Sequence, residues 1–302
     1  MNQKVRVSKM ALRITIDIFS GRENPVLELK GSAAREALKR LSLERRLRKD
    51  DMGLPPSPTL GYRGLIIEQI GRPIKALPRV FRLAHGDVFG KGLAHRIADE
   101  AFEDFVFRST GPIRKLKLGR KFPIMLRREI KRFRILRWDW PWGKKIIWPI
   151  RYSCRCAPLY EPNWWNDAGQ IQFYNNCYNY CTDYRTDTFA QPGRASGSQY
   201  TALTCSSVRP GAIADDLINR PLANNRCPKN GHLVALVIWS GVDYHWYRKG
   251  RNGLWSHKPG GTAVTNLDNS GHLITDPRTA NRGGYTSFCT FMVVMHGHIK
   301  IK

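Results

Sequence analysis

The feature that most constrains the fold is an uninterrupted apolar segment followed by two strand-like segments on either side of a short turn. The run HLVALVIW at residues 232–239 is apolar at almost every position, which is typical of a strand covered on both faces. The segments YHWYRKG and LWSHKPG follow it and flank the turn Arg251-Asn252-Gly253. The chain from about residue 151 therefore predicts an antiparallel sheet built around residues 232–239.

The turn decides how two histidines are placed. Gly253 suits the left-handed third position of a three-residue loop, which combines a type I turn with a bulge. Residue 250 then pairs with 254 and residue 247 with 257, so His245 and His257 become diagonal neighbours on one face. One imidazole is then able to orient the other. A two-residue Asn-Gly turn would shift the register by one and put the histidines on opposite faces, so their pairing depends on the bulge.

The segment NNCYNYCTDY at residues 175–184 holds the candidate nucleophile. Cys177 follows two asparagines that suit a helix N-cap, and thiolate catalysis uses a cysteine at a helix start beside a base. The side chain of Asn176, or nearby backbone N–H groups, would suit an oxyanion. Cys181 comes one helical turn later, so we expect Cys181 in the core and Cys177 at the mouth of the site. The alternative is that both cysteines are structural, which is the common role of a cysteine taken alone.

The order of these features resembles the NlpC-type papain-like cysteine peptidases. The shared pattern is a cysteine at a helix start, a buried strand, a histidine, a glycine-containing hairpin and a second histidine, over about residues 170–260. The resemblance implies that Cys177 is the nucleophile, that His245 is the general base and acid, and that His257 orients His245. It also implies a papain-like domain with an antiparallel sheet and a helix carrying the cysteine, and a peptide substrate in the bacterial cell wall.

The chain departs from this family at two points. Tyr178-Asn179-Tyr180 stand where the family has small residues, and the 68 positions from Cys177 to His245 imply an insertion around residues 185–225. Both departures bear on the substrate more than on the fold. The strings NNCYNYCTDYRTDTFAQPGR, HWYRKGRNGLWSHKPG and LITDPRTANRG are also similar to uncharacterised bacterial proteins, a likeness that carries no activity with it.

Besides Asn176, three residues are candidates for auxiliary roles in the site. Asp243 either holds the imidazole of His245 or ends the preceding loop. Tyr174 either covers the thiol or packs. Asp276 either replaces His257 as third member or caps a turn before Pro277.

Residues 1–112 predict a small α+β accessory module, so the chain as a whole is expected to be α+β. LRITIDIFS at residues 11–19 alternates apolar and polar positions as a half-buried strand does, and VLELKG follows the turn SGRENP as a second strand. AAREALKRLSLERRLR has helical spacing with Ser32 as its N-cap, and GLAHRIADEAFEDFVFRS also predicts a helix. We find no catalytic constellation in this part of the sequence.

Residues 113–150 predict a basic, aromatic-rich linker before the domain at residues 151–302. The chain has a formal net charge of +26, and residues 114–148 contain 13 basic and two acidic side chains together with four Trp. Pro123, Pro141 and Pro149 argue against one continuous helix. This composition favours an anionic polymer or surface, namely nucleic acid, lipid or cell wall, as the partner of residues 114–148. The alternative is a solvated linker whose aromatic side chains pack on a neighbouring domain.

All seven cysteines lie in the C-terminal half. We expect disulfides among Cys154, Cys156, Cys181, Cys205, Cys227 and Cys289, with Cys177 unpaired. A structural zinc held by Cys154, Cys156, Cys227 and His232 is a weak alternative because the ligand spacing is unusual. We therefore predict no metal and no cofactor. The clustered cysteines suit a compact domain that matures in an oxidising compartment. The N-terminus has no pattern of a secretory signal and no apolar stretch spans a bilayer, which argues for a cytoplasmic or non-classically exported protein, so the compartment stays open.

These patterns favour a cysteine hydrolase that cleaves an amide bond in a cell-wall peptide or a protein through a thioester intermediate. Two other classes stay open. One is a basic nucleic-acid- or membrane-binding protein with a non-catalytic C-terminal scaffold. The other is an injected toxin or effector with amidase or deamidase activity.

Overall fold

The computed structural model describes residues 10–46, 59–71, 73–90, 93–116, 118, 121–136 and 154–302, and the structural statements below concern these residues. Contacts divide the chain into two units. The first comprises residues 1–18, 24–57 and 62–138, and the second comprises residues 19–23, 58–61 and 139–302. The second unit therefore includes two short segments from the N-terminal part of the chain, which the boundaries predicted from the sequence assign elsewhere.

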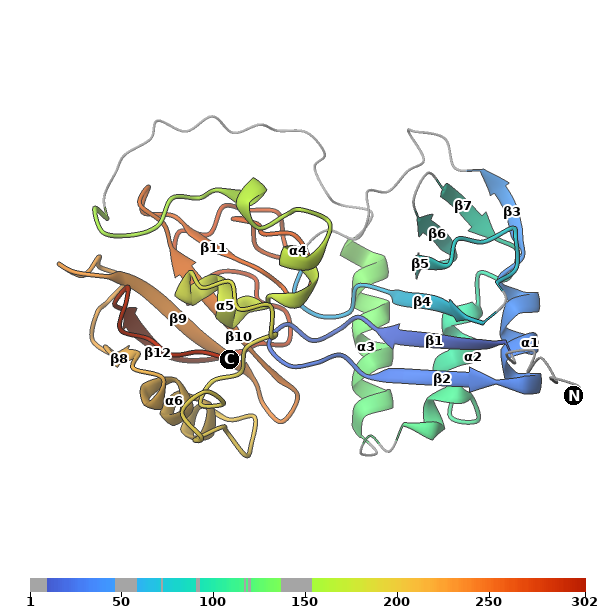
Figure 1. Cartoon of the computed structure of the whole chain (residues 1–302), viewed down its shortest axis with the longest axis horizontal. Coiled ribbons are helices and arrows are strands. Elements are labelled where there is room, and N and C mark those ends of the chain that lie inside the picture. Colours follow the sequence, from blue (N-terminus) through green and yellow to red (C-terminus); the bar gives the residue numbers. More distant parts are fainter. Residues whose placement is uncertain are drawn as a thin grey trace, which may run out of the picture. The chain divides into compact units, whose positions relative to one another are not determined.

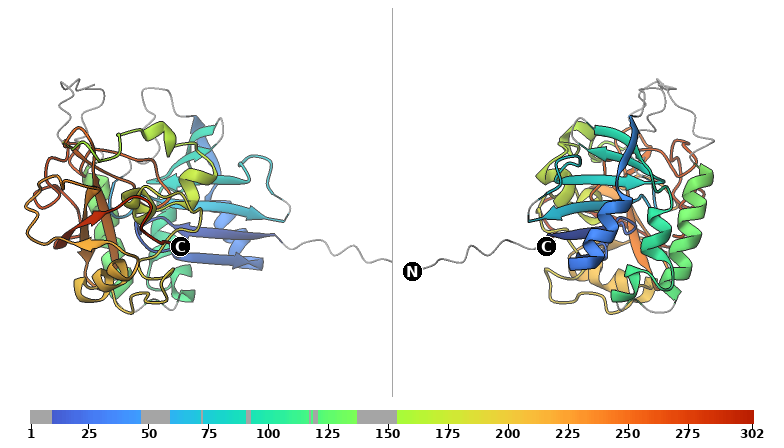
Figure 2. Two further views of the ribbon diagram at one scale, coloured as in Figure 1. Left: turned by 60° about the vertical axis from the view of Figure 1, so that its left-hand side comes forward. Right: turned by 90° about the vertical axis from the view of Figure 1, so that its right-hand side faces the viewer.

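The first unit contains a seven-stranded sheet in the order β2-β1-β4-β5-β6-β7-β3, with every neighbouring pair antiparallel (Figure 1). The strands are β1 (Ala11–Ile16), β2 (Val26–Lys30), β3 (Leu43–Arg46), β4 (Leu65–Ile70), β5 (Val80–Ala84), β6 (Asp87–Gly90) and β7 (Leu93–Ile97). Leu12, Ile14 and Ile16 of β1 are fully buried, as the alternating sequence predicts. Helix α1 (Gly31–Arg40) buries Ala34, Ala37 and Leu38 and packs on β1 and β2 (Figure 2).

Two helices predicted in this unit are wrong in part. The first ends at Arg40, because LERR continues as strand β3 and pairs with β7, and Ser32 lies inside α1 rather than capping it. In the second, LAHRI forms strand β7, which pairs with β6, and only Phe102–Phe107 is helical, as α2. Backbone pairing with neighbouring strands outweighs local helix propensity in both places.

The predicted linker contains a short 3-10 helix, η1 (Pro112–Lys115), and a long helix, α3 (Lys121–Leu136), both in the first unit. Pro123 is the third residue of α3, where its missing N–H has no partner within the helix to lose. Pro141, Pro149 and the four Trp of this segment lie outside the described residues. Among the described helices, none combines the length and apolar character that crossing a bilayer requires.

The second unit contains a five-stranded antiparallel sheet in the order β11-β10-β9-β12-β8. Its strands are β8 (Ile218–Asn219), β9 (His232–Trp239), β10 (Asp243–Lys249), β11 (Trp255–His257) and β12 (Ser287–Val294). The helices of the unit are η2 (Pro162–Trp164), α4 (Gln170–Tyr174), α5 (Cys177–Thr182) and α6 (Cys205–Ala214). The mixed helices and antiparallel strands confirm the α+β class for both units.

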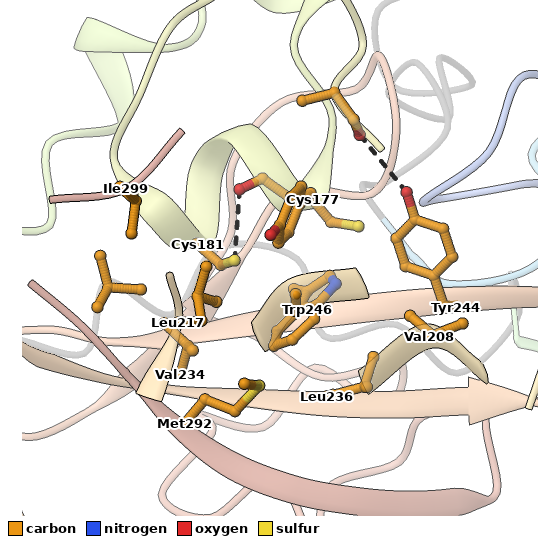
Figure 3. Packing of buried hydrophobic residues seen from close by; sticks show 14 of the residues in the cluster. Cys177, Cys181, Val208, Leu217, Val234, Leu236, Tyr244, Trp246, Met292 and Ile299 are labelled. Carbon is orange, nitrogen blue, oxygen red and sulfur yellow. Dashed lines mark hydrogen bonds between the residues drawn. The ribbon is translucent and has the colours of Figure 1, made fainter. Parts of the chain in front are cut away.

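Strand β9 is buried on both faces, as its apolar run predicts. Val234, Leu236 and Ile238 lie in a core cluster with residues of α5 and α6, and Figure 3 shows this packing, with Cys181 and Trp246 among the side chains that fill it. The alternate residues Leu233, Ala235 and Val237 lie in a second cluster, which includes residues after β11 and Leu60. Helix α5 packs directly on β10. This layering brings the candidate cysteine and histidine onto adjoining elements.

Candidate functional site

The hairpin between β10 and β11 has the register that the sequence predicts. Tyr247 pairs with His257 and Lys249 with Trp255, and the N–H of Gly250 donates to the carbonyl of Leu254. Gly253 has a φ of +80°, which is the left-handed conformation that the three-residue loop requires. The bulged turn is therefore confirmed, and with it the placement of the two histidines.

His245 and His257 form a directed hydrogen-bonded pair. The Nε2 of His245 lies 2.9 Å from the Nδ1 of His257, and the Nε2 of His257 lies 3.0 Å from the carbonyl oxygen of Leu267. A carbonyl only accepts, so His257 in its neutral form has its proton on Nε2 and accepts on Nδ1. His245 must then donate from Nε2, which leaves its Nδ1 unprotonated and available as a base.

Cys177 begins helix α5, directly after the N-cap Asn176. The side chain of Asn176 accepts from the N–H groups of Tyr178 and Asn179, and the side chain of Asn179 accepts from the N–H of Asn176. This reciprocal capping fixes the start of the helix, and with it the position of the thiol. Cys177 is fully buried, so the expectation that it stands at the mouth of the site is wrong, whereas Cys181 lies in the core as expected.

Ser20 connects the thiol with the imidazole. Its hydroxyl forms a short hydrogen bond with the Nδ1 of His245 and also hydrogen-bonds Cys177. Since Nδ1 is unprotonated, the hydroxyl of Ser20 donates to His245. The resulting chain of donors runs from Ser20 through His245 and His257 to the carbonyl of Leu267, with the Cys177 sulfur beside its first member.

The thiol is held in its neutral form in this arrangement. Burial raises the pKa of Cys177, and the negative charge of Asp243 raises it further. The backbone N–H of Trp246, the hydroxyl of Ser20 and the positive charge of Lys258 lower this pKa, but they do not offset the burial. The Nζ of Lys258 donates to the carbonyls of Gln172, Asn175 and Gly260 at 2.5–2.7 Å, so its charge is fixed in place near the thiol.

Asp243 binds the backbone of the Ser20 segment. Its carboxylate accepts from the N–H groups of Ser20 at 2.6 Å, Gly21 at 3.2 Å and Arg22 at 3.1 Å, and from the Tyr285 hydroxyl at 2.5 Å. Burial raises the pKa of Asp243 despite these hydrogen bonds. Asp243 therefore begins strand β10 and holds a segment from another part of the chain, a role that the sequence does not suggest.

Two predicted auxiliary residues serve elsewhere. Tyr174, for which packing was the alternative to covering the thiol, is 58% exposed. Asp276 accepts from the N–H and the guanidinium of Arg278, which corresponds to the turn-capping alternative. His257, and not Asp276, occupies the third position beside His245.

Sequence reasoning missed Ser20, Gln191, Tyr244 and Lys258. The amide of Gln191 and the hydroxyl of Tyr244 both donate to the carbonyl of Gly21, at 2.9 Å each, and the amide of Asn176 donates to the same oxygen at 2.7 Å. Tyr244 and Lys258 each adjoin a candidate histidine in the sequence, and that adjacency is the signal that could have found them. Ser20 is 225 positions from His245, and the string SGRENP reads only as a turn.

Two disulfides brace the second unit. Cys154 is bonded to Cys227 and Cys205 to Cys289, whereas Cys156, Cys177 and Cys181 are free thiols. The disulfides confirm part of the expected set and leave Cys177 unpaired as expected. Because Cys154 and Cys227 are joined in a disulfide, two of the four ligands of the alternative zinc site are not free to bind a metal.

The comparison with known proteins identifies a relative from a clam. Over 141 residues the chain is 46% identical to "Insoluble matrix shell protein 1" of Ruditapes philippinarum, a stretch that is 46% of this chain and 91% of the relative. The chain belongs to the family of this shell protein. No family model matches the chain, and no solved structure does.

The relative corrects the expected location. A shell matrix lies outside the cell, so the expectation of a cytoplasmic or non-classically exported protein is overturned by this comparison. The two disulfides are typical of a protein that matures in an oxidising compartment.

Proposed function

We propose that the second unit is a cysteine amide hydrolase with a papain-like arrangement of Cys177, His245 and His257. The observation that carries this proposal is the directed hydrogen-bond chain that leaves the Nδ1 of His245 unprotonated and linked through one hydroxyl to the Cys177 thiol. A nucleophile, a base and a group that orients the base are the three parts that thiol catalysis requires. The resemblance to the NlpC-type peptidases assigns the same three roles.

The reaction follows from these positions. His245 takes the proton of the Cys177 thiol, and the thiolate attacks the carbonyl carbon of the amide. The C–N bond breaks as His245 returns the proton to the leaving amine, and a thioester remains on Cys177. Water, activated by His245, then attacks the thioester carbonyl and releases the acid and the thiol. His257 keeps the His245 ring in place and stabilises its protonated form.

The setting of this reaction is proposed to be extracellular. The two disulfides of the second unit support this setting, and so does the relative named as a protein of the shell matrix. A peptide or protein outside the cell is then the substrate. An anionic partner for residues 114–148 stays a prediction, since much of that segment lies outside the described residues.

A second candidate is a matrix protein without catalytic activity. The full burial of Cys177 and the raised pKa of its thiol favour this candidate, because a reactive cysteine needs access and thiolate character. The name of the relative describes an insoluble matrix component, which is equally compatible with this role. Cleavage that depends on Cys177 separates the two candidates.

The test uses the full chain with Cys156→Ser, which removes the exposed free thiol. The protein is incubated with a defined pool of synthetic peptides, and new termini are read by mass spectrometry. Because the segment described below closes the site, we expect slow cleavage by this protein, which Cys177→Ala abolishes and which His245→Gln slows further by about 10²–10⁴-fold, the usual contribution of a general base. Cys181→Ala is the matched control, since it removes the other buried thiol of α5 and should leave cleavage in place.

The same pool is given to a variant with an opened site, Gly21→Ala, which is described below. Absence of Cys177-dependent cleavage in both proteins, with Cys177 shown to be accessible to a thiol reagent in the opened variant, would contradict the proposed hydrolase and favour the matrix role.

A further inference from the structure

The segment Ser20-Gly21-Arg22 occupies the candidate site of the second unit, although it comes from the loop between β1 and β2. It is a part of the second unit by its contacts, and Ser20 and Gly21 are buried. Its hydroxyl touches both reactive groups, as described above. The remaining contacts of the segment show what kind of molecule the site is built to hold.

Three side chains converge on one carbonyl of this segment. The oxygen of Gly21 accepts from the amide of Asn176 at 2.7 Å, the amide of Gln191 at 2.9 Å and the hydroxyl of Tyr244 at 2.9 Å. All three donors are buried, and one of them, Asn176, is the N-cap of α5. A carbonyl that is met by several fixed donors in a water-poor site is held as an oxyanion would be.

One carboxylate accepts hydrogen bonds from the N–H groups of the same segment. Asp243 accepts from three consecutive backbone N–H groups, those of Ser20, Gly21 and Arg22. The site therefore binds both the N–H groups and a carbonyl group of the peptide backbone. Arg22 adds a contact of its own, since its guanidinium donates to the carbonyl of Val242 at 3.1 Å and lies over the ring of Phe19.

The site restricts side-chain size at the centre of the segment. A Cβ at position 21 would lie 2.4 Å from the ring of Tyr244, a distance that real Cβ atoms do not adopt. The φ of Gly21 is not positive, so this glycine is required by the close approach of the ring and not by its own backbone conformation. The small side chain of Ser20, which precedes this glycine, hydrogen-bonds both His245 and Cys177.

We propose that Ser20-Gly21-Arg22 is a built-in occupant of a peptide-binding site, and that this site takes peptides with a small residue followed by glycine. As a statement about substrate, the inference rests on the proposed hydrolase; as a statement about binding, it rests on the contacts alone. The segment must leave before an external peptide enters, so the described arrangement is latent. Asn176, Gln191 and Tyr244 bind the carbonyl of the peptide, and Asp243 binds its N–H groups.

The experiment measures alkylation of Cys177 by iodoacetamide in the intact Cys156→Ser protein, with the labelled residue identified by peptide mapping. Gly21→Ala places a methyl group against Tyr244 and should expel the segment, which raises the labelling rate of Cys177 about tenfold or more. Glu23→Ala is the matched control, because this neighbouring side chain is exposed and its removal should leave the labelling rate unchanged.

A second measurement separates expulsion from misfolding. The pentapeptide FSGRE, acetylated and amidated, is added to the Gly21→Ala protein and should slow the labelling of Cys177 again by occupying the site. The peptide FSARE, which differs by one methyl group, should give no protection. A misfolded site would not distinguish the two peptides.

The inference is overturned if Cys177 of the parent protein reacts as fast as Cys177 of the Gly21→Ala protein, or if FSGRE gives no more protection than FSARE. Selective protection by FSGRE without any Cys177-dependent cleavage would support the peptide-binding site and contradict the proposed hydrolase. Full cleavage by the parent protein, with Cys177 freely labelled, leaves the hydrolase standing and removes the built-in occupant.

Discussion

Asp17 in the first unit and Asp243 in the second are both buried, and the pKa values of their carboxyl groups are shifted in opposite directions. Burial works to raise the pKa of Asp17 in the first unit, but the guanidinium groups of Arg63 and Arg82 lower it to about 2. The pKa of Asp243 in the second unit is raised by burial, because its partners are backbone N–H groups and the Tyr285 hydroxyl. Neutral donors satisfy the oxygens of a buried carboxylate without compensating its charge.

This difference separates a charge-compensated polar cluster from the cluster that we propose to be reactive. In the first unit the carboxylate of Asp17 lies 2.6 Å from the nearest guanidinium nitrogen of each arginine, so the cluster is charge-compensated and fixed. In the second unit a thiol, a hydroxyl, two imidazoles and a carboxylate lie together with raised pKa values at Cys177 and Asp243. Groups held away from their preferred charge state are those that exchange protons in a reaction, and they concentrate at functional sites.

Asp17→Ala should give the largest loss of stability, because it removes the buried carboxylate that pairs with the guanidinium groups of the fully buried Arg63 and of Arg82. Removal of one partner from a buried ion pair costs about 3–5 kcal/mol. Hydrogen exchange of β1, β4 and β5 measures the loss in the first unit. The folded-state pKa of Asp17 is lower than its ordinary value of 3.8, so the loss should be complete above that value and should shrink as the pH falls towards 2.

Asp243→Ala tests the buried carboxylate of the second unit. It should lower the free energy of unfolding by less, about 1–3 kcal/mol, because it removes hydrogen bonds to neutral donors and breaks no buried ion pair. It should also loosen Ser20-Gly21-Arg22 and raise the labelling rate of Cys177, which Asp17→Ala should not do. The free energy of unfolding and the labelling rate of Cys177 are measured for both variants in one experiment. Equal losses of stability, with no change in Cys177 labelling for either, would show that the two aspartates have the same structural role.

The parts of the site that follow from local sequence were predictable. Gly253 selects the turn that sets the register of His245 and His257, and Asn176 caps the helix that carries Cys177. The continuous apolar character of residues 232–239 likewise identifies the central strand of the second sheet. Each of these features depends on neighbours within a few positions.

The parts that depend on distant contacts were not predictable. Ser20 reaches His245 across 225 positions, and no pattern in its own loop indicates where the loop packs. Residues Leu93–Ile97 have helical composition but form a strand, because β6 offers a partner for their backbone. Cys177 lies in a core cluster with residues distant in sequence, so the sequence suggests an accessible thiol and the structure shows a buried one.

The smallest effect is expected at His232, a titratable group of the second unit that lies outside the candidate site. Burial lowers its pKa to about 3, although a hydrogen bond with the carbonyl of Cys181 opposes the shift, and the charges of Arg248 and His296 add to it. The folded state therefore keeps His232 neutral while the unfolded chain takes up a proton below pH 6.5, so stability should fall as the pH falls from 6.5 towards 3. His232→Gln removes this titration and should flatten the pH dependence of hydrogen exchange in β9 by up to about 1.4 kcal/mol per pH unit. Peptides from the first unit provide the internal control, since their exchange should keep its pH dependence in the variant. An unchanged slope in β9 would mean that His232 binds protons equally in the folded and unfolded states, which would contradict a neutral buried imidazole.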